Sequence, residues 1–191
     1  ILPFSNFVSI VEGITPARFK EFVENSVSAS KGGSNSGNGR FAQISGFSFV
    51  WDTLGTSLEY DVVTNALITA GQRIWEIRLD DGTYIVRNGE VMAGAPTVNF
   101  AIADFSAKGG DQYPLSDLPM TTVGATYQQA LFNYITAADG LNGLIDSISY
   151  PENGEGRISY RDCSSLAIDS VLAIDARRYN AFFSLPSATR Y

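Results

Sequence analysis

Residues 72–86, QRIWEIRLDDGTYIV, decide the fold class of this chain. Polar Glu76 and Arg78 alternate with apolar residues, which is the period of a half-buried β-strand. Asp81-Gly82 then predicts a type I′ turn, and Tyr84–Val86 is the expected return strand. Strands that a short turn connects are antiparallel. The stretch therefore predicts a β-hairpin, and it argues against a doubly wound parallel sheet.

The sequence before this hairpin predicts one strand and one helix. Residues 2–11, LPFSNFVSIV, mix β-branched and aromatic residues in the manner of a strand. Thr15 is a helix N-cap and Pro16 suits the first helical position. The apolar residues that follow fall at helical spacing and predict a buried stripe: Phe19, Phe22, Val23 and Val27. A Gly/Ser/Asn-rich loop is expected over residues 30–39.

Further strands and one more helix are expected in the rest of the chain. Residues 40–52, RFAQISGFSFVWD, alternate like a strand with Gly46 as a bulge, whereas residues 57–71 fit a strand or a helix. Residues 97–105, TVNFAIADF, predict a strand buried on both faces. Residues 125–138 predict a helix with one apolar face, formed by Tyr127, Ala130, Leu131, Tyr134 and Ile135. Together these elements indicate an α+β fold, with mixed, mostly antiparallel sheets packed against helices.

Composition limits the classes of function. The 191 residues suit one domain, or one domain with an appendage, and the net charge of −7 argues against a nucleic-acid partner. Histidine is absent, which excludes His-containing zinc sites and Ser-His or Cys-His nucleophilic pairs. No apolar run is long enough for a membrane span, and the N-terminus does not have the pattern of a signal peptide. The first residue is not Met, which we interpret as a processed or excised chain.

Residues 101–114, IADFSAKGGDQYPL, are the strongest candidate for a functional segment. Adjacent Gly109 and Gly110 let the backbone turn tightly or pass close to another group. Asp111 follows them and Phe105 precedes them, so an aromatic ring and a carboxylate are available for a flat polar ligand. The same residues also fit an ordinary loop that ends a strand, and the pattern alone leaves both readings open.

Three segments in order resemble the C-terminal domain of the 5′-nucleotidase family: residues 2–27, LPFSNFVSIVEGITPARFKEFVENSV; residues 39–52, GRFAQISGFSFVWD; and residues 84–113, which end in NFAIADFSAKGGDQY. The match covers residues 1–158, because YPENGEGRI at 150–158 resembles the end of that domain in longer bacterial members. Residues 159–191 would then be a C-terminal extension of unknown role. The resemblance implies the α+β fold of that domain.

The resemblance also implies a nucleoside-binding site. Phe4 and Phe105 would stack on the two faces of the base, Asp111 would hold the ribose hydroxyls, and the backbone at Gly39 would line the base edge. Gly109 and Gly110 would permit the close approach of the loop. In this family two divalent metal ions belong to a separate N-terminal metallophosphoesterase domain. The chain would therefore bind a nucleoside or nucleotide without a cofactor or catalysis of its own, in a protein that is extracellular, on the cell surface or periplasmic.

The chain departs from the family pattern at three places. Ala103-Asp104 replaces the usual Asn before Phe105, and residues 56–70 look like an insertion. The chain also starts at the Pro-Phe turn, without the preceding helix that carries phosphate-contacting Arg in the family.

Two alternatives to the nucleoside-binding domain stay open. One is a structural or self-assembling module whose tail, residues 159–191, adds a strand to a neighbour's sheet. The other is an enzyme with a carboxylate-only metal site built from Asp80, Asp81 and Asp104, although acids next to a turn are expected for turn reasons alone.

Overall fold

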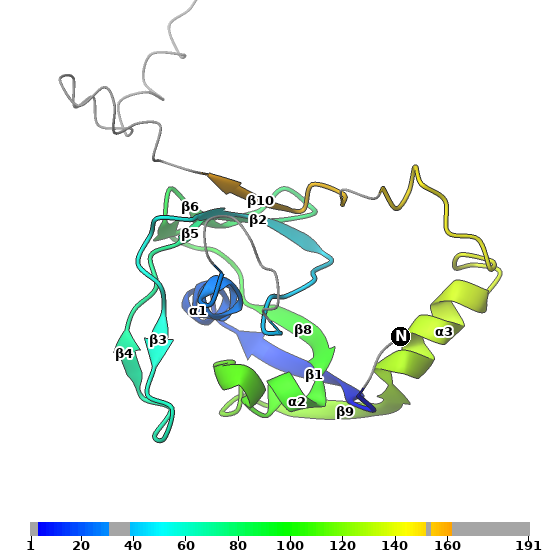
Figure 1. Ribbon diagram of the computed structural model, residues 1–191, viewed down its shortest axis with the longest axis horizontal. Coiled ribbons are helices and arrows are strands. Elements are labelled where there is room, and N and C mark those ends of the chain that lie inside the picture. The colour runs from blue at the N-terminus through cyan, green and yellow to red at the C-terminus, as the bar shows by residue number, and fades with distance from the viewer. Residues whose placement is uncertain (1–3, 31–38, 152–153, 162–191) are drawn as a thin grey trace, which may run out of the picture.

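The structure is a computed structural model that describes residues 4–30, 39–151 and 154–161. It has an α+β fold in which helix α1 lies between two sheets (Figure 1). The three-stranded sheet has the order β8-β1-β9 and consists of β8 (Val98–Ala103), β1 (Phe7–Ile14) and β9 (Met120–Thr126). The five-stranded sheet has the order β10-β2-β5-β6-β7 and consists of β10 (Ile158–Arg161), β2 (Phe47–Asp52), β5 (Ile74–Leu79), β6 (Tyr84–Arg87) and β7 (Glu90–Val91). The fold class expected from the sequence is confirmed.

Helix α1 (Pro16–Val27) begins where the sequence predicts and buries the predicted stripe. The Thr15 side chain accepts a hydrogen bond from the backbone N–H of Arg18 at 3.3 Å, which satisfies one of the free donors of the first turn. The ring of Phe19 packs edge-on against Phe47 of β2 and Phe100 of β8, with centroids 4.9 and 4.8 Å away. One helical side chain therefore contacts both sheets, and the core lies along α1.

The predicted strand at residues 40–52 is shorter in the structure. Only β2, from Phe47 onward, is a strand, and its alternate residues Phe47, Phe49 and Trp51 are buried as expected. Residues 41–44 have no regular structure, and residues 39–46 line a cavity instead of pairing with a strand. The first strand is also shifted, because β1 covers Phe7–Ile14 rather than residues 2–11.

The predicted hairpin at residues 72–86 is present, but its turn type differs. Gly82 has φ +93°, whereas Asp81 is not in the positive-φ region that a type I′ turn requires. The backbone N–H of Gly82 donates to Leu79 O and that of Leu79 donates to Thr83 O, both at 2.9 Å. These bonds define a three-residue loop that ends in a left-handed glycine. Residues 57–71, for which the sequence left strand or helix open, contain a two-stranded antiparallel ribbon, β3 (Glu59–Tyr60) and β4 (Leu67–Thr69).

One burial prediction is wrong. Strand β8 is not buried on both faces: Asn99 and Ala101 are exposed, because only the opposite face of the strand, which carries Phe100, packs on α1. Helix α3 (Tyr127–Thr136) forms as predicted, but none of its residues is buried. A periodic pattern predicts the helix, and it does not tell whether another surface covers the apolar face.

Strand β10 completes the five-stranded sheet by pairing in parallel with β2, so that Ile158 lies beside Phe49. The strand runs past residue 158, where the sequence suggests a domain boundary, and that boundary stays a prediction. Residues 162–191, most of the expected extension, lie outside the described residues, as do positions 31–38 of the expected loop. None of the helices in the described part of the chain is long and apolar enough to cross a membrane.

Candidate functional site

The segment after β8 forms a tight turn whose two glycines have different roles. Phe105 lies in the short helix α2 (Asp104–Ala107), and Gly109 has φ +90°, a conformation that suits glycine. Gly110 lies directly under the ring of Phe105: a Cβ added at Gly110 would lie 2.5 Å from the ring carbons. Gly109 permits the left-handed turn, and the absence of a side chain at Gly110 leaves room for the Phe105 ring. The Gly-Gly pair therefore lets Phe105 pack against the loop.

Asp111 has an unusual backbone conformation within the 3-10 turn Gly110–Gln112. Its φ is +54° and its ψ is +28°, which is left-handed and uncommon for a residue other than glycine. Gln112 follows with φ +61°. Such conformations persist only where the surrounding structure holds them. Here the side-chain amide of Asn25, on α1, donates to the backbone O of Asp111 at 2.9 Å.

Asn25 connects this turn to Arg40, a residue 71 positions earlier than Asp111. Asn25 is completely buried, and its Oδ1 accepts a hydrogen bond from Arg40 Nη1 at 3.5 Å. The same guanidinium donates to Ser28 Oγ at 3.3 Å, and the backbone O of Arg40 accepts a hydrogen bond from the Tyr113 hydroxyl. The end of α1, residue 40 and the 109–113 turn are therefore tied to one another by side-chain hydrogen bonds.

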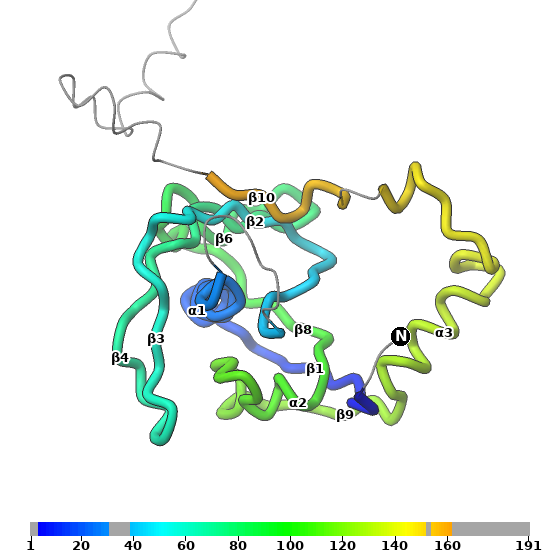
Figure 2. Tube along the Cα trace, in the orientation of Figure 1, coloured from blue at the N-terminus to red at the C-terminus, as the bar shows by residue number. Residues whose placement is uncertain are grey.

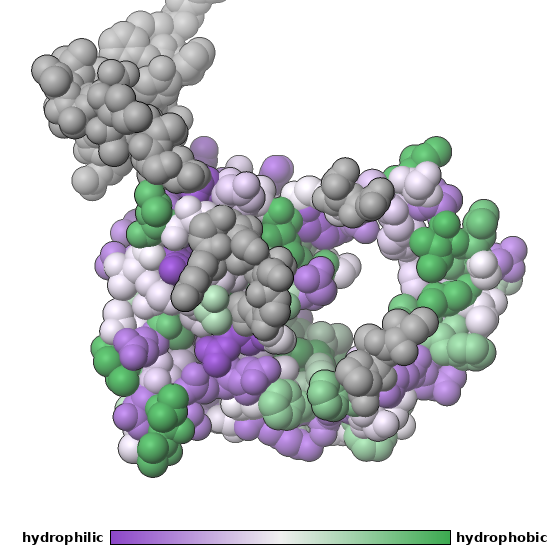
Figure 3. All heavy atoms as spheres, viewed as in Figure 1, coloured by the Kyte–Doolittle hydropathy of each residue, from purple (hydrophilic) through white to green (hydrophobic). Residues whose placement is uncertain are grey.

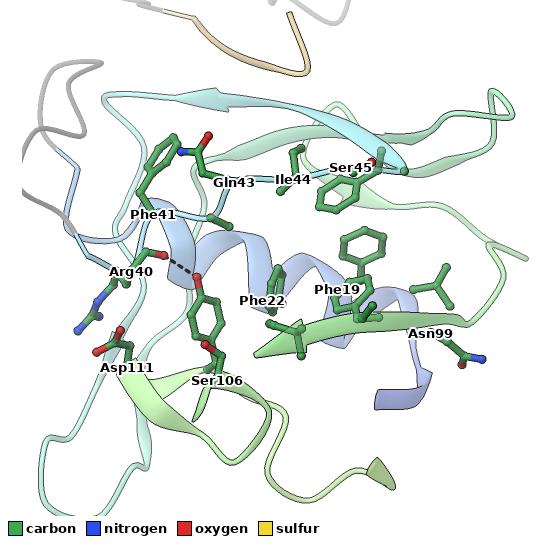
Figure 4. Close-up of a pocket in the computed structure, with 18 of the residues that line it drawn as sticks. Phe19, Phe22, Arg40, Phe41, Gln43, Ile44, Ser45, Asn99, Ser106 and Asp111 are labelled. Carbon is green, nitrogen blue, oxygen red and sulfur yellow. Dashed lines mark hydrogen bonds between the residues drawn. The ribbon is translucent and has the colours of Figure 1, made fainter. Parts of the chain in front are cut away.

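A cavity of about 770 Å³ opens beside this junction, between α1, β8 and residues 39–47. Figure 4 shows Arg40 and Asp111 together at one end of the cavity and Asn99 at the other. Its walls between these polar ends are largely aromatic, formed by Phe19, Phe22, Phe41, Phe47, Phe100 and Tyr113. An apolar pocket with a few convergent polar groups is the usual form of a small-molecule site.

The charges of Asp111 and Arg40 influence the pKa of the Tyr113 hydroxyl. Burial raises the pKa of the Tyr113 hydroxyl, the negative charge of Asp111 raises it further, and Arg40 opposes the shift. The phenol therefore stays protonated at neutral pH and keeps its hydrogen bond to residue 40. The carboxylate of Asp111 is exposed, so it remains available to a ligand.

The structure brings only some of the predicted site residues together. Gly39 and Asp111 line the large cavity, and Phe105 packs on Gly110 next to it. Gly109 lines a separate, smaller cavity of about 320 Å³. Their predicted roles toward a ligand stay predictions.

Phe4 and Phe105 lie at the same end of the β1-β8 pair. Val8 pairs with Ala103, and the backbone N–H of Phe7 donates to Asp104 Oδ1 at 2.9 Å. Phe4 comes three residues before this contact and Phe105 directly after it. Both rings are exposed, 67% for Phe4 and 49% for Phe105, and both can meet a flat ligand from solvent.

The three acids of the metal-site alternative make separate contacts. Asp80 pairs with Arg157 at 2.7 Å, Asp81 Oδ1 accepts from the N–H of Thr83 at 2.8 Å, and Asp104 pairs with Lys108 at 2.7 Å. The hydrogen bond from Lys108 is the main cause that lowers the pKa of Asp104. Within residues 4–30, 39–151 and 154–161, no group of three or more Asp, Glu or Cys side chains is arranged to hold a metal ion.

Sequence reasoning missed Asn25, Arg40 and Tyr113. A signal for Asn25 was present, because three polar residues, Glu24-Asn25-Ser26, interrupt the last turn of an otherwise apolar stripe, and all three are buried. Arg40 directly follows Gly39 in the second matched segment, but only the folded chain places it beside Asp111.

Comparisons with known proteins support the fold and no more. No profile of a known protein family matches the sequence, and no curated protein matches it. Among solved structures, a 5′-nucleotidase precursor from Thermus thermophilus superposes with a TM-score of 0.57 at 19% identity, over 84% of this chain and 26% of that chain. A Staphylococcus aureus protein assigned as a 5′-nucleotidase, in complex with alpha-ketoglutarate, gives a TM-score of 0.49 at 15% identity, over 84% of this chain and 28% of that chain. The superposition on the Thermus thermophilus structure shows a 5′-nucleotidase-like fold, and the chain spans about a quarter of the length of that protein.

Proposed function

We propose that this chain is the nucleoside-binding, C-terminal-type domain of a two-domain 5′-nucleotidase-like phosphohydrolase. The observation that carries the proposal is the contact between Phe105 and Gly110, which holds a half-exposed aromatic ring against the residue that directly precedes the exposed Asp111. An aromatic ring can stack on a base and a carboxylate can accept hydrogen bonds from a sugar, so the two groups suit the two halves of a nucleoside.

The Phe105 ring provides the stacking surface for the base. Gly110 lies against the ring, and about half of the side chain remains open to solvent. Stacking of a base on an aromatic ring contributes about 1–3 kcal/mol and tolerates any base, because every base has a π-face. Phe4, exposed at the same end of the sheet, is the second ring of the proposed sandwich.

Asp111 provides the contact to the sugar. An ionised carboxylate only accepts hydrogen bonds, and its two oxygens can accept one from each hydroxyl of a ribose. The hydrogen bond from Asn25 to the backbone O of Asp111 holds the turn that carries the carboxylate before a ligand binds. Gly39 lies on the same cavity and offers its backbone to the base edge.

The remainder of the reaction belongs to another part of the parent protein. The chain spans about a quarter of the Thermus thermophilus neighbour. The family resemblance implies that a separate domain with two divalent metal ions would perform the hydrolysis. No chemical step is assigned to residues of this chain. The family resemblance supports a location outside the cytoplasm for such a protein: on the cell surface, in the periplasm or secreted.

Isothermal titration of the full chain with adenosine, and then with AMP, tests the proposal. We expect millimolar or tighter binding by the wild type. Phe105→Ala should weaken it by at least about fivefold, the equivalent of about 1 kcal/mol for one lost stacking face. Asp111→Asn should weaken it as well, because an amide accepts at one atom where the carboxylate accepts at two.

Two matched variants serve as controls. Phe132→Ala removes an exposed ring on α3, and Asp139→Asn neutralises an exposed acid after that helix, so both should bind adenosine like the wild type. Absence of adenosine binding by the wild-type chain contradicts the proposal. An unchanged dissociation constant in Phe105→Ala contradicts the stacking role.

A further inference from the structure

Two backbone edges that no described strand pairs with border the large cavity. Strand β8 pairs only with β1 among the described strands, and residues 98–102 all line the cavity. Successive residues of a strand point to opposite faces, so it is the edge of β8, rather than one face, that borders the cavity. Residues 41–45 line it as well, and their backbone forms no hydrogen bond with another described residue. Backbone N–H and C=O groups are therefore open on both sides of the cavity.

The inner wall between these two edges is aromatic. Phe19 and Phe22 of α1 line it, together with Phe47 and Phe100. Figure 2 shows residues 39–46 passing near β8 and α1 before the chain enters β2. An occupant of this space needs apolar side chains toward α1 and hydrogen-bonding groups along both of its sides. An extended polypeptide has this chemistry, because each residue carries a backbone donor and an acceptor, and addition of a strand to an open edge uses it.

The size of the cavity matches one short strand. Its volume is about 770 Å³. A strand of about five residues takes up roughly 800 Å³ in a packed sheet, because strands rise about 3.4 Å per residue, lie about 4.8 Å apart and have layers about 10 Å apart. The two bordering edges, residues 41–45 and 98–102, have this length as well.

One segment outside the described residues has the sequence of such a strand. Residues 31–38, KGGSNSGN, contain no apolar side chain, and residues 1–3 and 152–153 are too short. Residues 162–191 remain. Within them LAIDSVLAI, at 166–174, alternates with the period of a strand, and one face carries four large apolar residues: Leu166, Ile168, Leu172 and Ile174.

The connection from β10 is long enough to bring this segment to the cavity. Strand β10 ends at Arg161 beside Asp52, the last residue of β2, and Phe47 at the start of β2 lines the cavity. The length of β2 is about 17–20 Å, whereas residues 162–169 span up to about 26–29 Å when extended. A tethered segment also has an effective concentration in the millimolar range, which favours it over a partner in solution. Figure 3 shows another hydrophobic surface over α3 and the segment after it, but the backbone of a helix is bonded internally and offers no strand edge.

We propose that residues 166–174 enter the cavity as an additional β-strand, between β8 and residues 41–45 of the same chain. The apolar face of this strand packs on Phe19 and Phe22 of α1, and Asp169 lies on the opposite face. Phe105, the stacking ring of the proposed nucleoside site, does not line the cavity, so this inference does not depend on nucleoside binding.

Hydrogen exchange of the full chain, followed by mass spectrometry, tests the strand. The backbone amides of residues 41–45 should be protected, although no described residue bonds to them. Leu172→Pro removes a donor from the added strand, so exchange at residues 41–45 should become about tenfold faster or more. Ala188→Pro, outside the alternating segment, is the matched control and should exchange like the wild type. Fast exchange at residues 41–45 in the wild type, or equal exchange in the two variants, overturns the proposal.

A spin label distinguishes the same chain from a second copy. In a Cys163→Ser background, a nitroxide on Asp169→Cys should broaden the amide signals of residues 41–45 and 98–102 more than those of the β3-β4 ribbon. A mixture of spin-labelled chains without isotope and ¹⁵N-labelled chains without nitroxide should show no such broadening. Broadening that appears in the mixture means that the segment enters a second copy, and it overturns the proposal. Absence of broadening at residues 41–45 in the singly labelled chain overturns it too, and this is the result expected if another domain or protein fills the cavity.

Discussion

The carboxylate of Glu24 lies buried at the end of α1 and accepts a 2.9 Å hydrogen bond from the backbone N–H of Ile74, 50 residues later in the sequence. The second carboxylate oxygen accepts from the N–H of Arg73 at 3.0 Å, and Lys20 lies 3.7 Å away. One side chain thus satisfies two backbone donors where β5 begins. It joins the central helix to the five-stranded sheet.

Glu24→Gln should lower the free energy of unfolding by about 1–3 kcal/mol, because an amide has one acceptor for two N–H groups and leaves a buried donor unpaired. Urea unfolding followed by circular dichroism measures the change. Glu90→Gln, on the exposed strand β7, is the matched control and should have no effect. Equal stability of Glu24→Gln and the wild type would show that the two backbone donors find other partners.

The same carboxylate should give stability a pH dependence of known sign. Burial raises the pKa of Glu24 above its ordinary value of 4.5, although the two backbone hydrogen bonds oppose the shift. Between about 4.5 and the raised pKa the folded state holds more protons than the unfolded state, so the contribution of Glu24 to stability falls as pH rises. The stability difference between wild type and Glu24→Gln should therefore be larger at about pH 4 than at about pH 7. Urea unfolding of both proteins across this range measures it, and a difference that grows with pH would contradict the sign.

Gly110→Ala should impair nucleoside binding more than stability. The new Cβ would lie 2.5 Å from the Phe105 ring, and since that ring is half exposed it can swing outward at a cost of about 1 kcal/mol. The displaced ring no longer offers its proposed stacking position. Thermal unfolding together with adenosine titration separates the two effects. Gly39→Ala meets nothing within 4 Å and serves as the control for stability.

Two substitutions at Asp111 should separate backbone strain from ligand contact. Asp111→Gly removes the carboxylate but suits the left-handed φ of +54°, so stability should stay the same or rise by up to about 1 kcal/mol. Asp111→Ala removes the carboxylate and keeps the strain without a polar side chain, so stability should fall by about 1 kcal/mol. Both should lose adenosine binding to the same extent. Equal free energies of unfolding for the two variants would contradict the expectation that the left-handed backbone at position 111 destabilises a residue other than glycine.

Tyr113→Phe should lower the free energy of unfolding by about 1 kcal/mol, because the carbonyl of Arg40 loses its hydroxyl donor in a buried place. Hydrogen exchange by mass spectrometry should show faster exchange near residue 40, since the Tyr113 hydroxyl holds that backbone. Tyr160→Phe, at a side chain that is 59% exposed, is the control. Unchanged exchange near residue 40 would mean that Asn25 and Ser28 alone hold the segment.

Local pattern in the sequence determined the elements with their own chemical signals. Thr15-Pro16 begins α1, the apolar stripe of α1 is buried, and alternate residues of β2 face the core, all as predicted. The hairpin at residues 72–86 forms, and with it the antiparallel character that excludes a doubly wound sheet. These features follow from caps, turns and periodicity, which act between residues close in sequence.

Tertiary structure alone decided which faces are covered and which side chains meet. The apolar pattern of α3 resembles that of α1, but α1 lies between two sheets while α3 has no described surface against it. Likewise Asn25, Arg40 and Asp111 come from three separate segments, and only packing brings them to one end of the cavity. A periodic sequence pattern shows only which side chains of an element are apolar and which are polar. Which distant group it meets depends on how the elements pack, and no local interaction between neighbours in sequence encodes that.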